Sequence, residues 1–393
     1  MAIKMNRREL IQFLMLVGAV GTVPLVCSAP LGGARKQRAL VLVELNGGND
    51  SLNCFIPLAQ EERYKALRPA LHLSAEERVK LDDNIALHKA LSPLRNGWLD
   101  KDLALVHGLG YPEPNLSHFR SIEIWDTASN SDSYKTTGWL SSLAKQPTKS
   151  GVDALVLGRN SGPVAGGKGA VLQADLLRHF LGKSRQLDHI DGAKNNAAYS
   201  HLLSVQNNLV SVAKDLLPIL QKKDAVKTIF PETLLGRQLA EIAQLINLGV
   251  DTPVYKVALS GFDTHRNQKP VHQRLLSQLS AALLAFREEM IRSGHWDDVV
   301  VMTYSEFGRR PKMNGSGGTD HGTAASHIVM GGKVRGGHIG KYPELPEKDN
   351  ANMMQFTTDF RVLYQTVLDR WFELPDIRLA DALEGSLPLF RES

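Results

Sequence analysis

Apolar residues occur along this chain in short unbroken runs of strand length. The clearest run, at 299–304, reads Val-Val-Val-Met-Thr-Tyr, and a second at 39–45 ends in a glycine-rich turn. Runs without polar alternation are typical of strands that are buried on both faces, as in a parallel sheet. The same pattern predicts further strands at 103–108, 154–158, 254–259 and 327–332.

Between these runs, apolar residues recur at spacings of three and four, which predicts amphipathic helices. Thr357 or Thr358 could cap the last helix. Strands that alternate with helices predict an α/β fold, with a mostly parallel sheet and helices on both faces. We find no composition break within 35–393 and predict a single domain there. The predicted helices are 201–222, 231–248, 272–292 and 357–372.

The composition changes this picture little. The 393 residues are 43% hydrophobic and 22% charged, which is ordinary for a globular protein. That composition excludes a disordered chain, a collagen and a multi-span membrane protein. A net charge of +5 without a concentrated basic face gives no argument for nucleic acid as a partner.

The N-terminus has the layout of an export signal. Arg7 and Arg8 precede a mildly apolar run at 11–27, and small residues follow it. The paired arginines favour export by the twin-arginine translocase, with cleavage of a signal at 1–34 and a periplasmic or extracellular location. An uncleaved anchor is an alternative, although the run is short for a span, and so is a lipoprotein at Cys27. We expect no stable membrane span in the mature chain.

Acidic and imidazole side chains follow several predicted strands, at the sheet edge where open α/β sheets bind ligands. Carboxylates gathered at one edge would repel each other, and a divalent cation removes that conflict. Mixed imidazole and carboxylate ligands suit zinc, manganese or iron, whereas calcium or magnesium would suit a mostly carboxylate set. The candidate ligands are Asp50, Asp263, His265, Glu306, Asp320 and His321.

Each of these residues also has a simpler interpretation. Asp50 and Asp320 follow glycines and could be turn residues. His265 could be an ordinary hydrogen-bonded histidine, and Glu306 could form an ion pair at the end of its strand. Their shared position at one predicted edge favours a metal or polar catalytic centre.

A further candidate, Ser117, follows Pro114 at the start of a predicted helix. The positive end of the helix dipole there favours anions and a more acidic hydroxyl group. The alternative is that Ser117 only caps the helix.

Five motifs occur along the chain in this order: LNGGND at 45–50, SHFR at 117–120, GFDTH at 261–265, SEFGR at 305–309 and GTDHG at 318–322. Together they are similar to the bacterial exported proteins called domain of unknown function 1501, over about residues 39–372. The resemblance implies an alkaline phosphatase-like fold, shared with sulfatases and cofactor-independent phosphoglycerate mutases, but no settled reaction.

The resemblance also implies roles for single residues. Asp50 would bind a metal ion, Asp263 and His265 would share one, and Ser117 would be the nucleophile. His321 matches a further metal-binding histidine. Two departures stand out: Asp263 and His265 are closer in sequence than in alkaline phosphatases, and Glu306 follows a serine where Asp-His is usual. The formylglycine signature of sulfatases is absent.

These observations predict a metal-dependent hydrolase of phosphate or sulfate esters, with zinc, manganese or calcium as the ion. Its substrate would be an anionic ester. Ser117 would attack, with Ser51 as the competing nucleophile, and His118 or Arg120 would stabilise charge on the non-bridging oxygens. The alternative is a non-catalytic exported protein that keeps the fold and binds envelope polysaccharide.

Overall fold

The computed structural model describes residues 38–145, 148, 152–167, 170–178, 180, 216–222, 225–347, 353–379 and 385–392. The predicted export signal at 1–34 lies outside these residues, as does 201–215 of the predicted helix at 201–222. Within the described part, no helix combines the length and apolar character that crossing a membrane requires.

One nine-stranded sheet organises the described chain, in the order β11-β5-β10-β9-β1-β8-β6-β7, with β12 also paired to β5. Neighbouring strands run parallel except β10, which is antiparallel to both β5 and β9. The strands are β1 (Ala39–Asn46), β5 (Leu103–Gly110), β6 (Ala154–Leu157), β7 (Val171–Ala174), β8 (Val254–Ser260), β9 (Val299–Tyr304), β10 (Ala325–Met330), β11 (Gly337–Ile339) and β12 (Thr358–Asp359).

Strand β1, at the centre of the sheet, shows why its sequence is mostly apolar. Val41 and Val43 pack into one hydrophobic core, while Leu40 and Leu42 pack into another on the opposite face. Successive side chains of a strand point to opposite faces, so burial on both sides favours apolar residues along most of the strand. The exceptions, Glu44 and Asn46, lie near its carboxyl end. Both faces of the sheet are therefore core.

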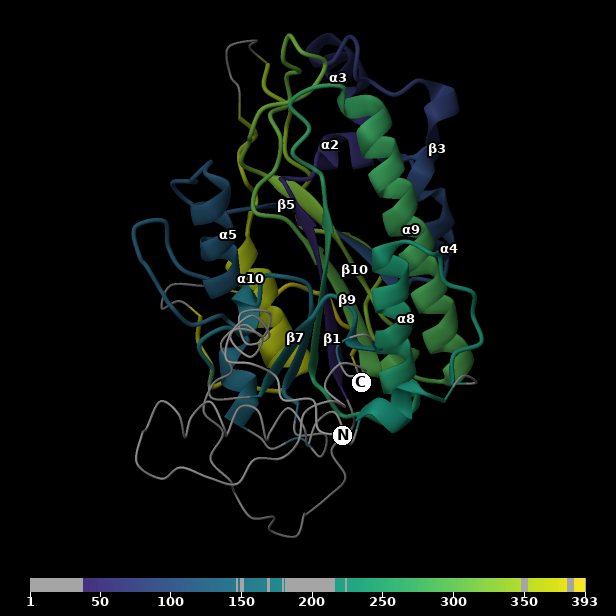
Figure 1. The fold of residues 1–393 in the computed structure, drawn as a ribbon. Coiled ribbons are helices and arrows are strands. Elements are labelled where there is room, and N and C mark those ends of the chain that lie inside the picture. Colours follow the sequence, from purple (N-terminus) through teal and green to yellow (C-terminus); the bar gives the residue numbers. More distant parts are fainter. Residues whose placement is uncertain are drawn as a thin grey trace, which may run out of the picture.

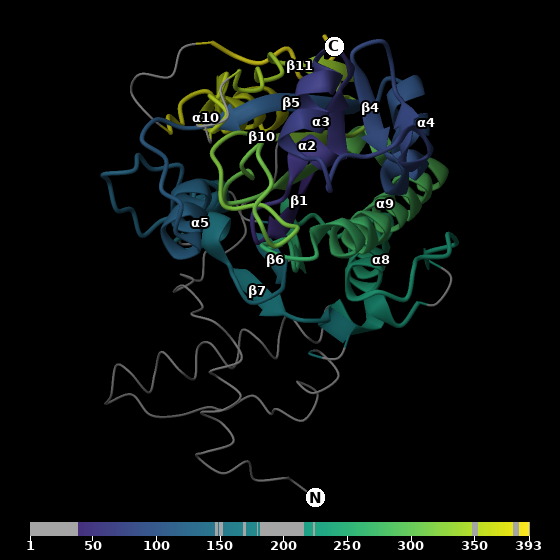
Figure 2. The same ribbon diagram turned by 90° about the horizontal axis from the view of Figure 1, so that it is seen from above.

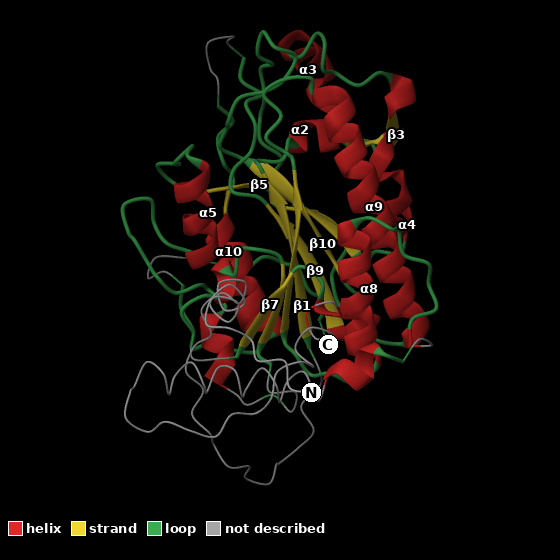
Figure 3. Cartoon of the chain, viewed as in Figure 1, coloured by secondary structure: helices red, strands yellow, loops and turns green. Residues whose placement is uncertain are grey.

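Helices cover each face. Figures 1 and 2 show α4, α8 and α9 on one side of the sheet and α5 and α10 on the other. In Figure 3 the strands lie between these two groups. The helices are α4 (Arg95–Leu99), α8 (Leu234–Asn247), α9 (Gln268–Ser293), α5 (His118–Thr127) and α10 (Phe360–Thr366), which continues as a π-helical turn, Val367–Trp371.

The predicted architecture, a mostly parallel sheet with helices on both faces, is confirmed. The sequence patterns missed β7, β11 and β12, which are too short to show a clear period. They also missed a second, three-stranded sheet in the order β2-β4-β3. It lies in the segment that also contains α2 and α3. These elements are α2 (Ser51–Cys54), β2 (Phe55–Pro57), α3 (Glu61–Leu67), β3 (Arg78–Lys80) and β4 (Ile85–His88).

The C-terminal helix begins later than predicted. Thr358 pairs with β5 as part of β12, and the cap is Asp359, whose Oδ1 accepts a hydrogen bond from the Arg361 backbone N–H at 2.9 Å. A carboxylate that accepts from the first turn satisfies one of the unpaired helix donors. Asp359 therefore does what was expected of Thr357 or Thr358.

Candidate metal centre

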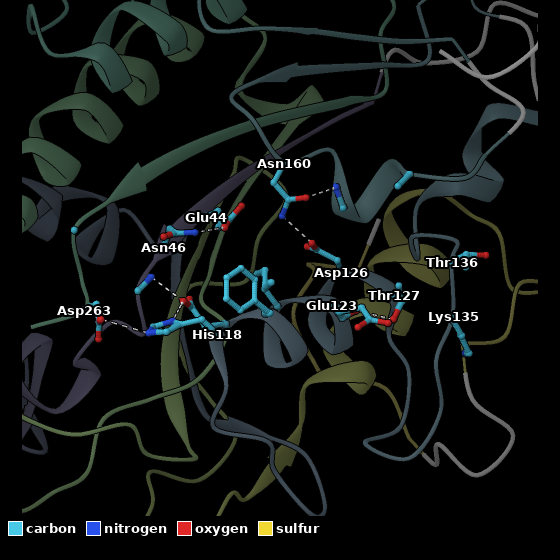
Figure 4. Close-up of a pocket in the computed structure, with 17 residues that line it drawn as sticks. Glu44, Asn46, His118, Glu123, Asp126, Thr127, Lys135, Thr136, Asn160 and Asp263 are labelled. Carbon is cyan, nitrogen blue, oxygen red and sulfur yellow. Dashed lines mark hydrogen bonds and ion pairs between the residues drawn. The ribbon is translucent and has the colours of Figure 1, made fainter. Parts of the chain in front are cut away.

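Four side chains, from the start of α5 and from two loops, converge at the edge of the sheet where β1, β8 and β9 end. We call His118, Asp263, His265 and His321 the His–Asp cluster. Single ligand atoms of His118, Asp263 and His321 lie within 4.8 Å of one another. His265 Nε2 is 3.1 Å from Asp263 Oδ1 and 3.0 Å from His321 Nε2. Figure 4 shows His118 pointing at Asp263.

The topology explains this meeting. Asp263 and His265 follow β8, and His118 opens α5 after β5. His321 lies four residues before β10. Because β10 is antiparallel to its neighbours, the residues before it lie at the same edge as the residues after β9. The antiparallel strand thus adds a histidine to an edge otherwise made of strand ends.

Each imidazole of the cluster is held through Nδ1 by an acceptor. Carboxylates and backbone carbonyls accept hydrogen bonds, so each Nδ1 carries a proton and Nε2 is left as the ligand atom. The contacts are His118 Nδ1 to Glu306 Oε1 at 2.8 Å, His265 Nδ1 to Asp320 Oδ1 at 3.0 Å, and His321 Nδ1 to the Leu116 carbonyl at 2.8 Å.

The facing nitrogens of His265 and His321 make this edge a good cation site. Two Nε2 lone pairs at 3.0 Å repel each other unless a proton or a cation lies between them. Imidazole nitrogens together with one carboxylate are a donor set that zinc prefers. The residues therefore fit a divalent metal ion.

Asp263 supplies the negative charge of the cluster. Burial raises the pKa of Asp263, but the hydrogen bond from Arg309 at 2.7 Å outweighs this and holds the pKa at about 2. Its side chain is 47% exposed, so a ligand can reach the carboxylate. Asp263 is therefore ionised at neutral pH and open to a ligand.

The pKa values of His118 and His321 are shifted in opposite directions. The hydrogen bond to Glu306 raises the pKa of His118, whereas burial lowers the pKa of His321. A cation therefore competes with a proton more strongly at His118 than at His321. Metal affinity should consequently rise with pH over the range in which His118 titrates.

Glu306 and Asp320 were both predicted to be metal ligands. They instead accept hydrogen bonds from the histidines of the cluster. Both oxygens of Glu306 are engaged: Oε1 accepts from His118 and from the Gly47 backbone N–H at 2.8 Å, and Oε2 from Ser305 Oγ at 3.1 Å. Asp320 accepts from His265 and from Asn314 Nδ2 at 3.2 Å. The two carboxylates orient the histidines through Nδ1.

Asp50 does not join the cluster. Its side chain is 1% exposed and is paired with Arg68, whose Nη2 lies 3.0 Å from Oδ1. Gln268 donates a further hydrogen bond to it. Burial raises the pKa of Asp50, but Arg68 outweighs this and lowers it. Asp50 is an ionised carboxylate whose partner is already inside the protein.

The three predicted catalytic residues have different positions. Ser117 is exposed before α5, and its side chain forms no capping bond to the helix. Arg120 points away from the cluster: it donates to the carbonyl groups of Asn130, Ser131 and Ser133 and stacks on Tyr134. His118, expected to stabilise substrate charge, belongs to the cluster itself.

Arg309 and Arg68 were not predicted. Arg309 is completely buried and donates to Asp263 and to the carbonyl groups of Gly48 and Thr319 at 2.7 Å. It lies in the SEFGR motif, so the motif itself was the available signal. Arg68 lies outside the quoted motifs and lacks such a signal.

A cleft of about 760 Å³ opens beside the cluster. His118, Asp263 and Glu306 form one end of its lining, and α5 forms a wall. Figure 4 shows Glu44, Asp126 and Asn160 further along the cleft. This volume is in the usual range for small-molecule sites. The cluster is therefore reachable by a ligand of moderate size.

Comparison with solved structures finds weak similarities. A lipoteichoic acid synthase from Listeria monocytogenes is 8% identical, with 88% of this chain and 74% of that chain covered and a TM-score of 0.36. The C-terminal periplasmic domain of EcEptC from Escherichia coli, in complex with zinc, is 10% identical over 76% and 74% (TM-score 0.36). The sulfatase PsFucS1 from Pseudoalteromonas sp. is 10% identical over 84% and 67% (TM-score 0.36).

Because the sequence identities and TM-scores are this low, we assign no residue role in this chain from those structures. No curated protein matches the chain by sequence. The profile of a family described as "Protein of unknown function (DUF1501)" matches residues 104–384, which is more than half of the chain. This match confirms the resemblance predicted from the five motifs. The chain belongs to the DUF1501 family.

Proposed function

We propose that this protein is an exported, metal-dependent hydrolase of phosphate or sulfate esters. The observation that carries the proposal is the convergence of three imidazole Nε2 atoms on Asp263 at one end of an open cleft. Arg7 and Arg8 support export by the twin-arginine route.

A divalent cation bound by the cluster would supply Lewis acidity, which polarises an ester oxygen and makes a nearby water more acidic. His118, His265 and His321 would hold it through Nε2, and Asp263 through its carboxylate. Nitrogen-rich ligation favours zinc over manganese, and calcium least of all.

The remaining residues act on these ligands. Glu306 and Asp320 fix the tautomer and the ring direction of His118 and His265. Arg309 fixes the carboxylate of Asp263. Ser117 is not among the residues that line the cleft, so we assign the attacking oxygen to water rather than to Ser117 or to the buried Ser51.

The test measures metal content and the turnover of 4-nitrophenyl phosphate and 4-nitrophenyl sulfate. We expect bound zinc in the purified protein and turnover that falls at least about 100-fold in His321→Ala, together with loss of the ion. Ser117→Ala should keep most of the turnover. His295→Ala, a partly exposed histidine near the far end of α9, is the matched control and should change neither quantity.

Two results would contradict the proposal. A protein without metal that is nevertheless active would remove the cluster from the reaction. A zinc-loaded protein that is inactive on every ester would favour the non-catalytic, polysaccharide-binding alternative. Loss of turnover in Ser117→Ala at full metal occupancy would return the attack to Ser117.

A further inference from the structure

The cleft beside the His–Asp cluster has one apolar wall. Phe119 and Ile122 line it from α5, one helical turn apart, so their side chains lie on the same face of the helix. Phe119 directly follows His118 of the cluster, and 89% of its side chain is exposed. A large aromatic ring left in solvent beside a candidate reaction centre is available to pack on a ligand.

Four other lining residues are polar and are hydrogen-bonded within the protein. Glu44 and Asn46 come from the end of β1, Asp126 from the end of α5, and Asn160 from the loop after β6. Asn160 Nδ2 donates to Asp126 Oδ2 at 2.9 Å, and Asn46 Nδ2 donates to Glu44 Oε1 at 2.9 Å. Figure 4 shows both pairs in the cleft. These groups form a pre-arranged row of carboxylates and amides.

The carboxylates of this row already have partners within the protein. Glu44 forms a buried ion pair with Lys256, and the partly exposed Glu123 lies 2.9 Å from Arg120 Nη1. Tyr304 Oη donates to Asp126 Oδ1 at 3.2 Å. Burial raises the pKa of Asp126 to about 7. Lys135, which also lines the cleft, donates to the Leu379 carbonyl at 3.3 Å, so the lining carries charges of both signs. Electrostatics therefore requires neither a cationic group nor a second anionic group of the ligand here.

We infer that the cleft binds a neutral polyhydroxylated ring, so that the substrate is the phosphate or sulfate ester of a sugar. This inference rests on the proposed function. The C–H face of a sugar ring is the apolar complement of Phe119, and its hydroxyl groups can donate to carboxylates and exchange hydrogen bonds with amides. A bare aryl group could pack on Phe119 but would form no hydrogen bond with these carboxylates and amides.

The test measures binding separately from turnover, by titration calorimetry on the zinc-loaded full chain. The probes are galactose 6-sulfate and glucose 6-phosphate, compared with phenyl phosphate and phosphocholine. We expect the sugar esters to bind about tenfold or more tightly than either comparison ligand. That ratio corresponds to about 1.4 kcal/mol.

Substitutions at two residues, Phe119 and Asp126, localise the effect. Phe119→Ala should weaken sugar-ester binding about tenfold, and Phe119→Tyr should restore it, because an exposed ring can be changed without disturbing the core. Asp126→Asn should weaken the sugar esters but not phenyl phosphate. Ile229→Ala is the control: Ile229 is 92% exposed, and its neighbour Thr228 contacts Glu289 near the far end of α9.

The outcomes separate this inference from the proposed function. Sugar esters that bind no better than phenyl phosphate, or that bind equally well to Phe119→Ala, would overturn the inference even if the protein hydrolyses aryl esters. Sugar esters that bind as expected but are not hydrolysed would support the inference and contradict the hydrolase.

Discussion

At the scale of single residues, the burial of an acidic side chain decides its role. Asp50 and Asp263 both follow strands of the central sheet, yet Asp50 is 1% exposed and Asp263 is 47% exposed. The Asp50 carboxylate is neutralised by the buried Arg68 guanidinium, while Asp263 faces the cleft. Asp50 therefore contributes to folding and Asp263 to the site.

Removing the charge of Asp50 should destabilise the protein without emptying the metal centre. Asp50→Ala leaves Arg68 as an unpaired buried charge, and we expect the free energy of unfolding to fall by about 3–5 kcal/mol, measured by urea denaturation. Asp83→Ala, which breaks an exposed pair with Lys80, should change it by less than about 1 kcal/mol. Loss of zinc at native fold from Asp50→Ala would contradict this assignment.

Sequence reasoning predicted which residues gather at the sheet edge better than which of them touch a ligand. Asp263, His265 and His321 were found because strand ends are readable from apolar runs. Glu306 and Asp50 were also predicted to be ligands. Glu306 instead accepts a hydrogen bond from Nδ1 of His118, and Asp50 pairs with Arg68 at the end of α3. Strand position fixes the place of a backbone, whereas the direction of a side chain depends on partners remote in the sequence, here 188 and 18 residues away.

At the scale of elements, the site depends on close contact between the loops after β1 and β8. Gly47 has φ +118°, and a Cβ atom there would lie 2.3 Å from the Asp263 backbone nitrogen. Its N–H also donates to Glu306 at 2.8 Å. Only glycine allows this conformation and this approach without strain. Gly47 thus sets the spacing between Asp263, a residue of the cluster, and Glu306, the carboxylate that orients His118.

Gly47→Ala should therefore displace the Asp263 loop and weaken zinc binding at least about tenfold, as measured by competition with a chromogenic chelator. Gly294→Ala is the matched control. Gly294 also has a positive φ, +79°, but apart from its chain neighbours no atom of the described residues lies within 4 Å of the added Cβ. It should cost about 1–2 kcal/mol of stability and leave zinc affinity unchanged. Equal zinc affinity in both variants would show that the loop contact does not position the cluster.

At the scale of the whole molecule, the central sheet was predictable because both of its faces are buried. The long strands, such as β1, β5 and β9, carry continuous apolar runs that two helix layers cover. The three-stranded sheet of β2, β3 and β4 has strands of three or four residues, too short for periodicity to be read. The pattern of apolar residues therefore predicts the layered core but misses the short strands around it.

The last prediction links the cluster to the stability of this whole fold. An ion that binds only the native state stabilises it by about 2.7 kcal/mol at a hundredfold excess over its dissociation constant. Since the cluster joins residues after β5 and β8 and before β10, that free energy should hold three parts of the sheet edge together. Chelator should therefore lower the melting temperature of the wild type, and His321→Ala should melt at the lower temperature with or without chelator.

Asp50→Ala should melt lower than the wild type yet keep its response to chelator, because its defect lies elsewhere. A wild-type melting curve that chelator leaves unchanged, in protein shown to contain zinc, would mean that the ion is not held by these elements.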